Sequence, residues 1–184
     1  HKEYRRQRQM CIRDSVITVP TAAAALMNHT IDADISTLKN IFCGSAPMPT
    51  KLFEKFQKET GVSIIEGYGM TEATCLVSCN PPDGERKIGS VGLPLPFTEV
   101  RVLKISRKDE VLKECKDGEP GEVCVYNPGI NIGFTYTDPS KNKSLFIEDK
   151  FLRTGDIGYL DVDGYLWLTG RAKDVIMRGG HNIC

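Results

Sequence analysis

A strand–helix–strand pattern in the first half of the sequence constrains the fold more than any other feature. Residues 38–43 and 62–65 are two short apolar runs that are typical of buried strands. Between them, Leu52, Phe53 and Phe56 share one face of a predicted helix whose lysines face water. A helix that joins two strands in this way makes a right-handed crossover between parallel neighbours. The sequence therefore predicts part of a parallel α/β sheet.

A glycine-containing segment follows each of these two strands. Residues 44–47, Gly-Ser-Ala-Pro, follow the first strand, and residues 66–72, Glu-Gly-Tyr-Gly-Met-Thr-Glu, follow the second. Ligands of open α/β sheets bind beyond the carboxyl ends of the strands. We therefore expect both segments to be loops that border one binding site.

The residue types of the second segment suit a nucleotide. Its glycines let the backbone approach a ligand closely, and Tyr68 offers a flat face to a base. Thr71 offers a hydroxyl group to a phosphate, and Glu72 offers a carboxylate to Mg²⁺. Composition alone favours a plain glycine-rich turn with Tyr68 in the core. The order of the residues decides between the two interpretations.

Residues 68–72, Tyr-Gly-Met-Thr-Glu, resemble the signature of the adenylate-forming superfamily of acyl-CoA synthetases, aryl-CoA ligases, luciferases and peptide-synthetase adenylation domains. Residues 154–156, 170–174 and 178–183 resemble later motifs of the same family, in the same order. The resemblance extends from about Val16 to the last residue. It implies an α/β plus β fold: part of a parallel-sheet subdomain, then a small β-barrel, ending just past the hinge to a C-terminal domain.

The resemblance also implies a role for each motif. Tyr68 would stack on adenine, Thr71 would contact a phosphate and Glu72 would hold Mg²⁺. Asp156 would accept hydrogen bonds from both ribose hydroxyls, and Arg171 would be a second ribose contact. The full set of implied nucleotide-binding residues is Gly44, Ser45, Ala46, Pro47, Glu66, Gly67, Tyr68, Gly69, Met70, Thr71, Asp156 and Arg171.

Further roles fall near the end of the sequence. Lys173 matches the hinge about which the family's C-terminal domain rotates, and Gly179 and Gly180 match the loop that lines the coenzyme A channel. The implied catalytic residues are Thr71, Glu72 and Lys173. Taken without the resemblance, the Gly-Asp of residues 155–156 would be an ordinary Asx-type turn.

From about Ile88 the sequence changes to short β-prone runs separated by Gly and Pro turns, which is typical of a small barrel or sandwich. The predicted strands cover residues 99–105, 121–126, 151–153, 158–160 and 165–169. We therefore divide the chain into an α/β adenine-binding part at 16–84, a β-barrel part at 85–170, and the hinge with the start of a C-terminal domain at 171–184.

Residues 1–15 do not share these patterns. They are polar and basic without helical or strand periodicity, so we expect foreign sequence or a disordered end, with a functional basic arm as the other interpretation.

Composition narrows the partners and the compartment. Lys plus Arg and Asp plus Glu both number 24, and the resulting zero net charge indicates no nucleic-acid surface. The 7 cysteines lack metal-ligand spacing, as expected of reduced thiols in the cytoplasm. No apolar run approaches the roughly 20 residues that span a bilayer, and no signal peptide is visible.

Two elements that the family needs are absent from the sequence, namely the Ser/Thr/Gly-rich phosphate loop and the C-terminal catalytic lysine. We therefore expect a fragment of a larger enzyme, with little or no adenylation activity by itself, because positioned charges supply much of the catalytic effect.

The resemblance implies that ATP activates a carboxylic acid to acyl-AMP, with a fatty acid as the first choice of substrate. Thioester formation with coenzyme A would follow. Three alternatives stay open: a non-catalytic nucleotide-binding remnant or module, an adenylation domain that loads a carrier protein, and a luciferase-type oxidation.

Overall fold

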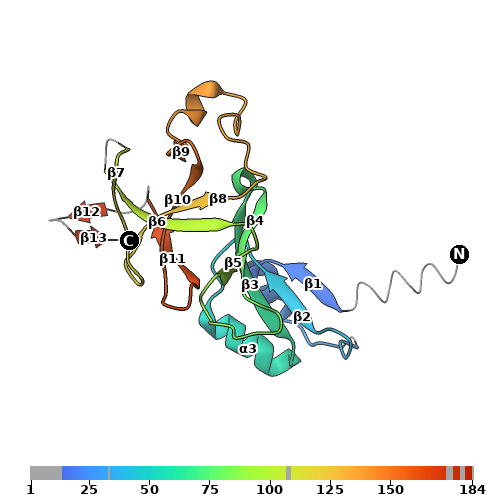
Figure 1. Cartoon of the computed structure of the whole chain (residues 1–184). Helices are drawn as coiled ribbons and strands as arrows, with labels where there is room; N and C mark the ends of the chain where they lie inside the picture. The colour runs from blue at the N-terminus through green and yellow to red at the C-terminus, as the bar shows by residue number, and fades with distance from the viewer. Residues whose placement is uncertain (1–13, 33, 107–108, 173–175, 179–180, 184) are drawn as a thin grey trace, which may run out of the picture.

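The computed structural model describes residues 14–32, 34–106, 109–172, 176–178 and 181–183. Within these ranges the chain forms an α/β half that carries strands β1 to β5 and a β half that carries strands β6 to β11 (Figure 1). Lys173, Gly179 and Gly180, for which the sequence implied roles, lie outside the described residues, as do residues 1–13 of the N-terminal segment.

The α/β half is built on a five-stranded sheet in the order β1-β2-β3-β4-β5. Its strands are β1 (Ser15–Thr18), β2 (Asn40–Cys43), β3 (Ser63–Met70), β4 (Cys75–Cys79) and β5 (Leu93–Pro94). Strands β1, β2 and β3 run parallel, with Ile41 of β2 opposite Ile64 of β3. The predicted parallel strand pair is therefore confirmed, and β4 and β5 extend it in antiparallel fashion.

Two helices cover one face of the parallel strands. They are α2 (Pro20–Leu26) and α3 (Thr50–Thr60). Helix α3 buries Phe53 and Phe56, and it ends at Gly61, whose φ of 69° is the left-handed conformation that glycine adopts readily. These phenylalanines pack with Ile41 and Ile64 in the first hydrophobic core. The apolar face predicted for this helix is confirmed.

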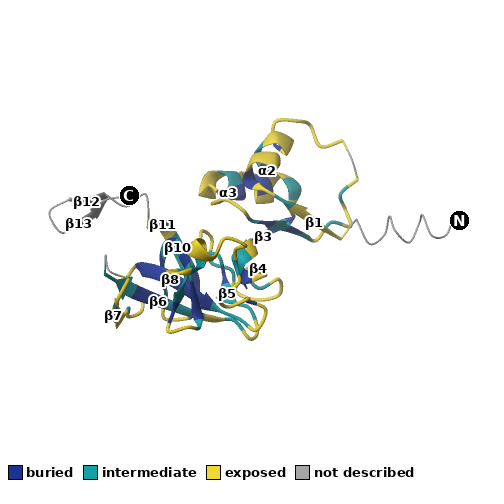
Figure 2. Ribbon diagram, turned by 90° about the horizontal axis from the view of Figure 1, so that it is seen from above, coloured by how far each residue is buried: buried dark blue, intermediate teal, exposed yellow. Residues whose placement is uncertain are grey.

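The β half is an antiparallel sheet in the order β11-β10-β8-β6-β7, with β9 paired to β10. Its strands are β6 (Glu99–Ile105), β7 (Val111–Glu114), β8 (Gly121–Tyr126), β9 (Phe146–Ile147), β10 (Phe151–Leu160) and β11 (Leu166–Arg171). Buried residues concentrate in β6, β8 and β10 (Figure 2). Strands β12 (Ile176–Arg178) and β13 (His181–Ile183) form a separate pair.

The expected closed barrel is not shown, because the strand path of this sheet is open among the described residues, from β11 to β7. The second hydrophobic core explains how the sheet is covered without closing on itself. In this core, Val77 of β4 packs with Val123 and Val125 of β8 and with Leu152 of β10. A strand of the first sheet thus covers apolar residues of the second.

Strand β10 joins two segments that the sequence predicted as separate strands. The register with β8 shifts between Arg153 and Ile157, and Gly155 has a φ of 72°. This bulge lets the strand continue through a local bend instead of ending there. It also places Asp156 in the strand, opposite Arg171 of β11.

None of the helices in the described part of the chain is long and apolar enough to cross a membrane.

The Asp161 carboxylate, in the turn between β10 and β11, makes the stability of the fold depend on pH in acid. The Asp161 carboxylate accepts hydrogen bonds from Lys87 Nζ at 2.8 Å and Trp167 Nε1 at 3.0 Å. Burial opposes the shift, but these bonds and those from the Asp163 and Tyr165 amides hold the pKa of Asp161 at about 2, against an ordinary value of 3.8. The stability that this carboxylate contributes is therefore fully present above about pH 4 and is lost as the pH falls toward 2.

We expect the Asp161→Asn variant to lose less stability than the unsubstituted chain between pH 5 and about pH 2, as measured by thermal unfolding across this range. Asp117→Asn, at an exposed turn, is the matched control. An equal loss of stability between pH 5 and about pH 2 in all three proteins would contradict the assignment of this effect to Asp161.

Candidate functional site

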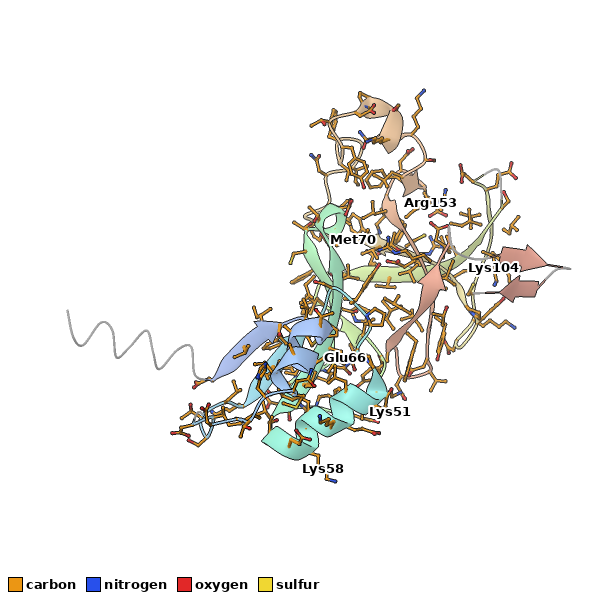
Figure 3. All side chains as sticks on the ribbon, turned by 180° about the vertical axis from the view of Figure 1, so that it is seen from behind. Lys51, Lys58, Glu66, Met70, Lys104 and Arg153 are labelled. Carbon is orange, nitrogen blue, oxygen red and sulfur yellow. The ribbon has the colours of Figure 1, made fainter. Side chains whose placement is uncertain are left out.

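The end of β3 presents two different faces. Gly67 and Gly69 border a cavity, whereas Tyr68 and Met70 pack against the second hydrophobic core. This alternation follows from the two-residue period of a strand. The segment predicted as a loop is therefore strand as far as Met70, because β4 pairs with it, Gly67 opposite Cys79 and Met70 opposite Cys75. Figure 3 labels Glu66 and Met70 along this strand.

A tight turn connects β3 to β4 and carries two implied site residues. It consists of the single 3₁₀ turn η1 (Thr71–Ala73), followed by Thr74 and Cys75, whose φ values of 61° and 82° are unusual for residues other than glycine. Ala73 is fully buried, which anchors the turn. Thr71 is left exposed and Glu72 half-buried at the tip of the hairpin.

Three implied site residues from distant parts of the sequence meet in one cluster. Tyr68 Oη donates to Asp156 Oδ2 at 2.5 Å across a separation of 88 residues. Arg171 Nε lies 3.1 Å from Asp156 Oδ1, and the Arg171 side chain is 71% exposed. Because a carboxylate has about four acceptor sites, each oxygen of the buried Asp156 retains one for a further donor.

The protonation of Tyr68 fits this arrangement. Burial raises the pKa of Tyr68, and its hydrogen bond to Asp156 raises it further. The phenol therefore stays a donor at neutral pH.

Glu72 accepts a hydrogen bond from Tyr136 Oη at 2.5 Å. The described residues contain no group of three or more His, Cys, Asp or Glu side chains that could hold a metal ion by themselves. A single carboxylate nevertheless fits Mg²⁺, which proteins often bind through one or two carboxylates together with the phosphates of a substrate. Glu72 is thus a suitable ligand for a cation that arrives with a nucleotide.

Glu66 lies one residue before the glycine face and is buried. It accepts a hydrogen bond from the Gly89 amide at 3.2 Å, and burial raises the pKa of this carboxyl group. Glu66 therefore connects β3 to the segment that leads into β5.

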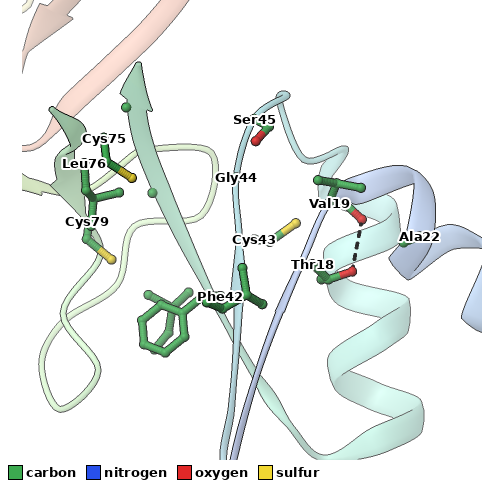
Figure 4. Close-up of a pocket in the computed structure, with 14 residues that line it drawn as sticks. Thr18, Val19, Ala22, Phe42, Cys43, Gly44, Ser45, Cys75, Leu76 and Cys79 are labelled. Atoms are coloured by element: carbon green, nitrogen blue, oxygen red, sulfur yellow. Dashed lines mark hydrogen bonds between the residues drawn. The ribbon is translucent and has the colours of Figure 1, made fainter. Parts of the chain in front are cut away.

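A cavity of about 650 Å³ lies on the glycine face of β3 (Figure 4). Its walls are apolar, small or thiol-bearing side chains, without a charged residue: Ile17, Thr18, Val19, Ala22, Phe42, Cys43, Gly44, Ser45, Ile65, Gly67, Gly69, Cys75, Leu76 and Cys79. Gly44 and Ser45 of the first predicted loop are therefore in the wall. Ala46 and Pro47 of the same loop are exposed and are not part of it.

Two residues of this region were missed by the sequence analysis. Tyr136 contacts Glu72 across 64 residues, and Asn127 Nδ2 donates to the Ala73 carbonyl across 54 residues at 2.9 Å. Both belong to a segment without strand or helix periodicity, so no local pattern in the sequence could have indicated the contacts.

Taken together, the parallel sheet, the β3–β4 hairpin and the cluster of Tyr68, Asp156 and Arg171 define an α/β unit of the adenylate-forming type. The chain belongs to the AMP-binding enzyme family, whose model matches residues 14–135.

Known proteins resemble this chain over most of its length. The marinolic acid–CoA ligase of Pseudoalteromonas sp. (strain SANK 73390) is 43% identical over 166 residues, which are 90% of this chain and 25% of that protein. The long-chain-fatty-acid–CoA ligase of Bacillus subtilis (strain 168) is 34% identical over 89% of this chain and 29% of its own length. The ATP-bound crystal structure of MatB from Rhodopseudomonas palustris superposes with a TM-score of 0.83 at 33% identity, covering 95% of this chain and 34% of MatB. The chain thus spans about a quarter to a third of these proteins.

Proposed function

We propose that this chain supplies the nucleotide-binding part of an AMP-forming ligase that activates a carboxylic acid with ATP and transfers the acyl group to coenzyme A. The observation that carries the proposal is the cluster of Tyr68, Asp156 and Arg171, which brings together residues up to 103 positions apart. The chain's membership of the AMP-binding enzyme family gives this cluster its meaning. The CoA ligases among its relatives support the same reaction class.

The chemistry of the residues suits each proposed contact. The ring of Tyr68 offers a face to adenine, and the Asp156 carboxylate accepts hydrogen bonds from the ribose hydroxyls, which are strengthened by its charge. Arg171 adds a flexible cation beside the ribose. Thr71 donates to a phosphate oxygen, and Glu72 binds Mg²⁺. When bound, Mg²⁺ neutralises phosphate charge.

In the proposed reaction, the carboxylate of the acid attacks the α-phosphate, the bond to pyrophosphate breaks, and acyl-AMP forms. The thiol of coenzyme A then displaces AMP. We assign the adenine-binding part to residues 16–84, the β part to 85–170 and the hinge to 171–184, although β5 (Leu93–Pro94) pairs with the sheet of the first part. Lys173 would be the pivot, and Gly179 and Gly180 would lie at the coenzyme A channel. The free cysteines in the described ranges support a cytoplasmic location.

We further propose that the acid is apolar, as a fatty acid is. The cavity next to the glycine face is bordered by Phe42, Ile65 and Leu76 and has no charged side chain in its wall. Such a wall would leave a second charge on the acid without a partner, which is costly. The B. subtilis relative, a long-chain-fatty-acid ligase, supports the same substrate class.

Gly67→Ala tests the acid site. The added Cβ would lie 3.3 Å from Leu76 Cδ1 and 3.3 Å from the Ser78 carbonyl oxygen, so it fits tightly and narrows the cavity. We expect kcat/KM of the complete ligase to fall about 10-fold for long saturated acids and little for short ones, since a methylene-sized change is worth about 1–3 kcal/mol. Gly61→Ala is the control: it lies outside the cavity wall, and its φ of 69° makes it the more strained of the two substitutions, so it measures the effect of lost stability alone. Equal losses at every chain length would contradict the proposal.

Calorimetric titration of the chain with AMP and with Mg·ATP tests the nucleotide site. We expect one adenine nucleotide to bind per chain, with GMP and GTP as controls for base recognition. Failure of the folded chain to bind either adenine nucleotide would reject the proposal in favour of a remnant without a working site.

A further inference from the structure

The loop between β8 and β9 reaches the tip of the β3–β4 hairpin. Its Tyr136 donates a hydrogen bond to Glu72 Oε1 at 2.5 Å, although the two residues are 64 positions apart. Tyr136 is exposed, with 37% of the residue accessible to solvent, so the contact lies at the surface of the hairpin tip. The contact joins the β half of the chain to the residue proposed to bind the cation.

Tyr136 is held in place by its own loop. The Tyr136 amide donates to Asn142 Oδ1 at 2.9 Å, and Asn142 Nδ2 donates back to the Tyr136 carbonyl at 2.9 Å. Asn142 ends the 3₁₀ turn η2 (Pro139–Asn142), which Asp138 caps by accepting from the Ser140 amide at 3.0 Å. The tyrosine therefore extends from a locally braced segment, and its hydroxyl has a defined direction.

The same loop contacts the hairpin at a second place. Asn127 Nδ2 donates to the Ala73 carbonyl at 2.9 Å, and Thr74 Oγ1 donates to Asn127 Oδ1 at 3.4 Å. Gly129 lies so close that an added Cβ would come within 2.7 Å of Thr74 Oγ1. The loop thus contacts Glu72 and also the two residues that follow it.

We propose that Tyr136 is a positioning residue for Glu72. Its hydroxyl donates a hydrogen bond to Oε1 and so directs the other carboxylate oxygen, Oε2, toward the cation of a Mg²⁺–nucleotide complex. One donor on Oε1 leaves the acceptor sites of Oε2 available. Groups that hydrogen-bond to a metal ligand restrict its orientation, and their removal typically weakens metal binding by 10–100-fold. The consequence for the cation rests on the proposed function, whereas the contact itself does not.

Tyr136→Phe tests this role because it removes the hydroxyl and keeps the ring. Mn²⁺ is the probe: the free ion is quantified by electron paramagnetic resonance in the presence of saturating ATP. We expect about 10-fold weaker Mn²⁺ binding by the variant, with unchanged ATP affinity in excess EDTA. Tyr159→Phe is the matched control, because it also removes one phenol hydroxyl, from a ring stacked on Trp167 at a centroid distance of 6.0 Å.

Two outcomes of the Mn²⁺ titration would overturn the inference. Unchanged affinity would mean that Glu72 needs no orientation by Tyr136, and tighter binding would mean that the hydroxyl competes with the cation. A loss of ATP affinity in EDTA equal to the loss of Mn²⁺ affinity would also overturn it, because the substitution would then act on the whole site.

A thermal-unfolding cycle with Tyr136→Phe, Glu72→Ala and the double variant tests the contact without any ligand. We expect the double variant to melt within about 1 °C of Glu72→Ala, because the hydrogen bond is lost only once. Fully additive decreases in Tm would overturn the contact. If the unsubstituted chain binds no Mg·ATP, the proposed function fails, and this cycle still decides whether Tyr136 and Glu72 are coupled.

Discussion

Asp156→Ala is expected to weaken AMP binding by about 100-fold or more. In the proposed complex Asp156 accepts both ribose hydroxyls, and two hydrogen bonds to a charged group are together worth about 3 kcal/mol or more. Asp156 is only 6% exposed, so bulk water cannot easily supply the acceptors that the Ala variant lacks. Calorimetric titration with AMP, on protein whose folding is verified by thermal melting, measures the change.

Two variants separate the ribose contact from its surroundings. Asp156→Asn keeps one carbonyl oxygen as an acceptor, so we expect a smaller loss, of about 10-fold. Tyr68→Phe removes the donor at 2.5 Å but leaves the carboxylate, so ribose binding should remain. A folded Asp156→Ala protein that binds AMP as tightly as the unsubstituted chain would exclude the ribose role.

Gly92→Ala is expected to destabilise the fold by about 4 kcal/mol or more. An added Cβ would lie 1.9 Å from the carbonyl carbon of Cys79 and 2.1 Å from the Asn80 nitrogen, which are backbone atoms. Gly92 cannot move away easily, because its carbonyl accepts from the Leu166 amide at 2.9 Å. Its φ of 87° adds the ordinary cost of a left-handed residue.

Gly118→Ala is the matched control for this prediction. Its φ of 75° is similar, but an added Cβ would meet no atom within 4 Å. We expect a loss of about 1 kcal/mol, from backbone strain alone. Equilibrium denaturation in urea measures both variants, and similar losses would show that close packing around Gly92 is unimportant.

Elements with a strong local pattern could be predicted from the sequence. Strands β6 and β8 have the predicted bounds, and α3 has the predicted apolar face. Local pattern failed where pairing partners decide the structure. Strand β3 continues to Met70 because β4 lies beside it, and η1 is followed by Thr74 and Cys75 with positive φ values that no glycine signals.

The β half shows the same limit. Gly155 suggested a break between two strands, but pairing with β8 and β11 carries β10 through it as a bulge. The barrel expected from the short β-prone runs and from the resemblance is not shown, since such runs predict strands but not the element that covers their buried face. Val77 of β4 contributes to that cover, and its sequence neighbours gave no indication of this.

The contacts of the candidate site could likewise be predicted only in part. Tyr68, Asp156 and Arg171 were implied by motif resemblance, and the fold brings them into one cluster. The contact between Tyr136 and Glu72 could not be predicted, because it depends on where a long irregular loop lies relative to a hairpin.

The pleat of β3 has a consequence for how such a protein can diverge. Gly67 and Gly69 face the cavity proposed for the acid, while Tyr68 between them faces the cluster proposed for the nucleotide. On the proposed function, a substitution at Gly67 can therefore alter which acid is accepted without touching the nucleotide side, whereas Gly69 is fixed, because an added Cβ there would lie 1.8 Å from the Cys75 carbonyl oxygen. A one-residue insertion in the strand would instead exchange the two faces and lose both. On the proposed function, this strand therefore favours point substitution over length variation as the evolutionary route to new acids.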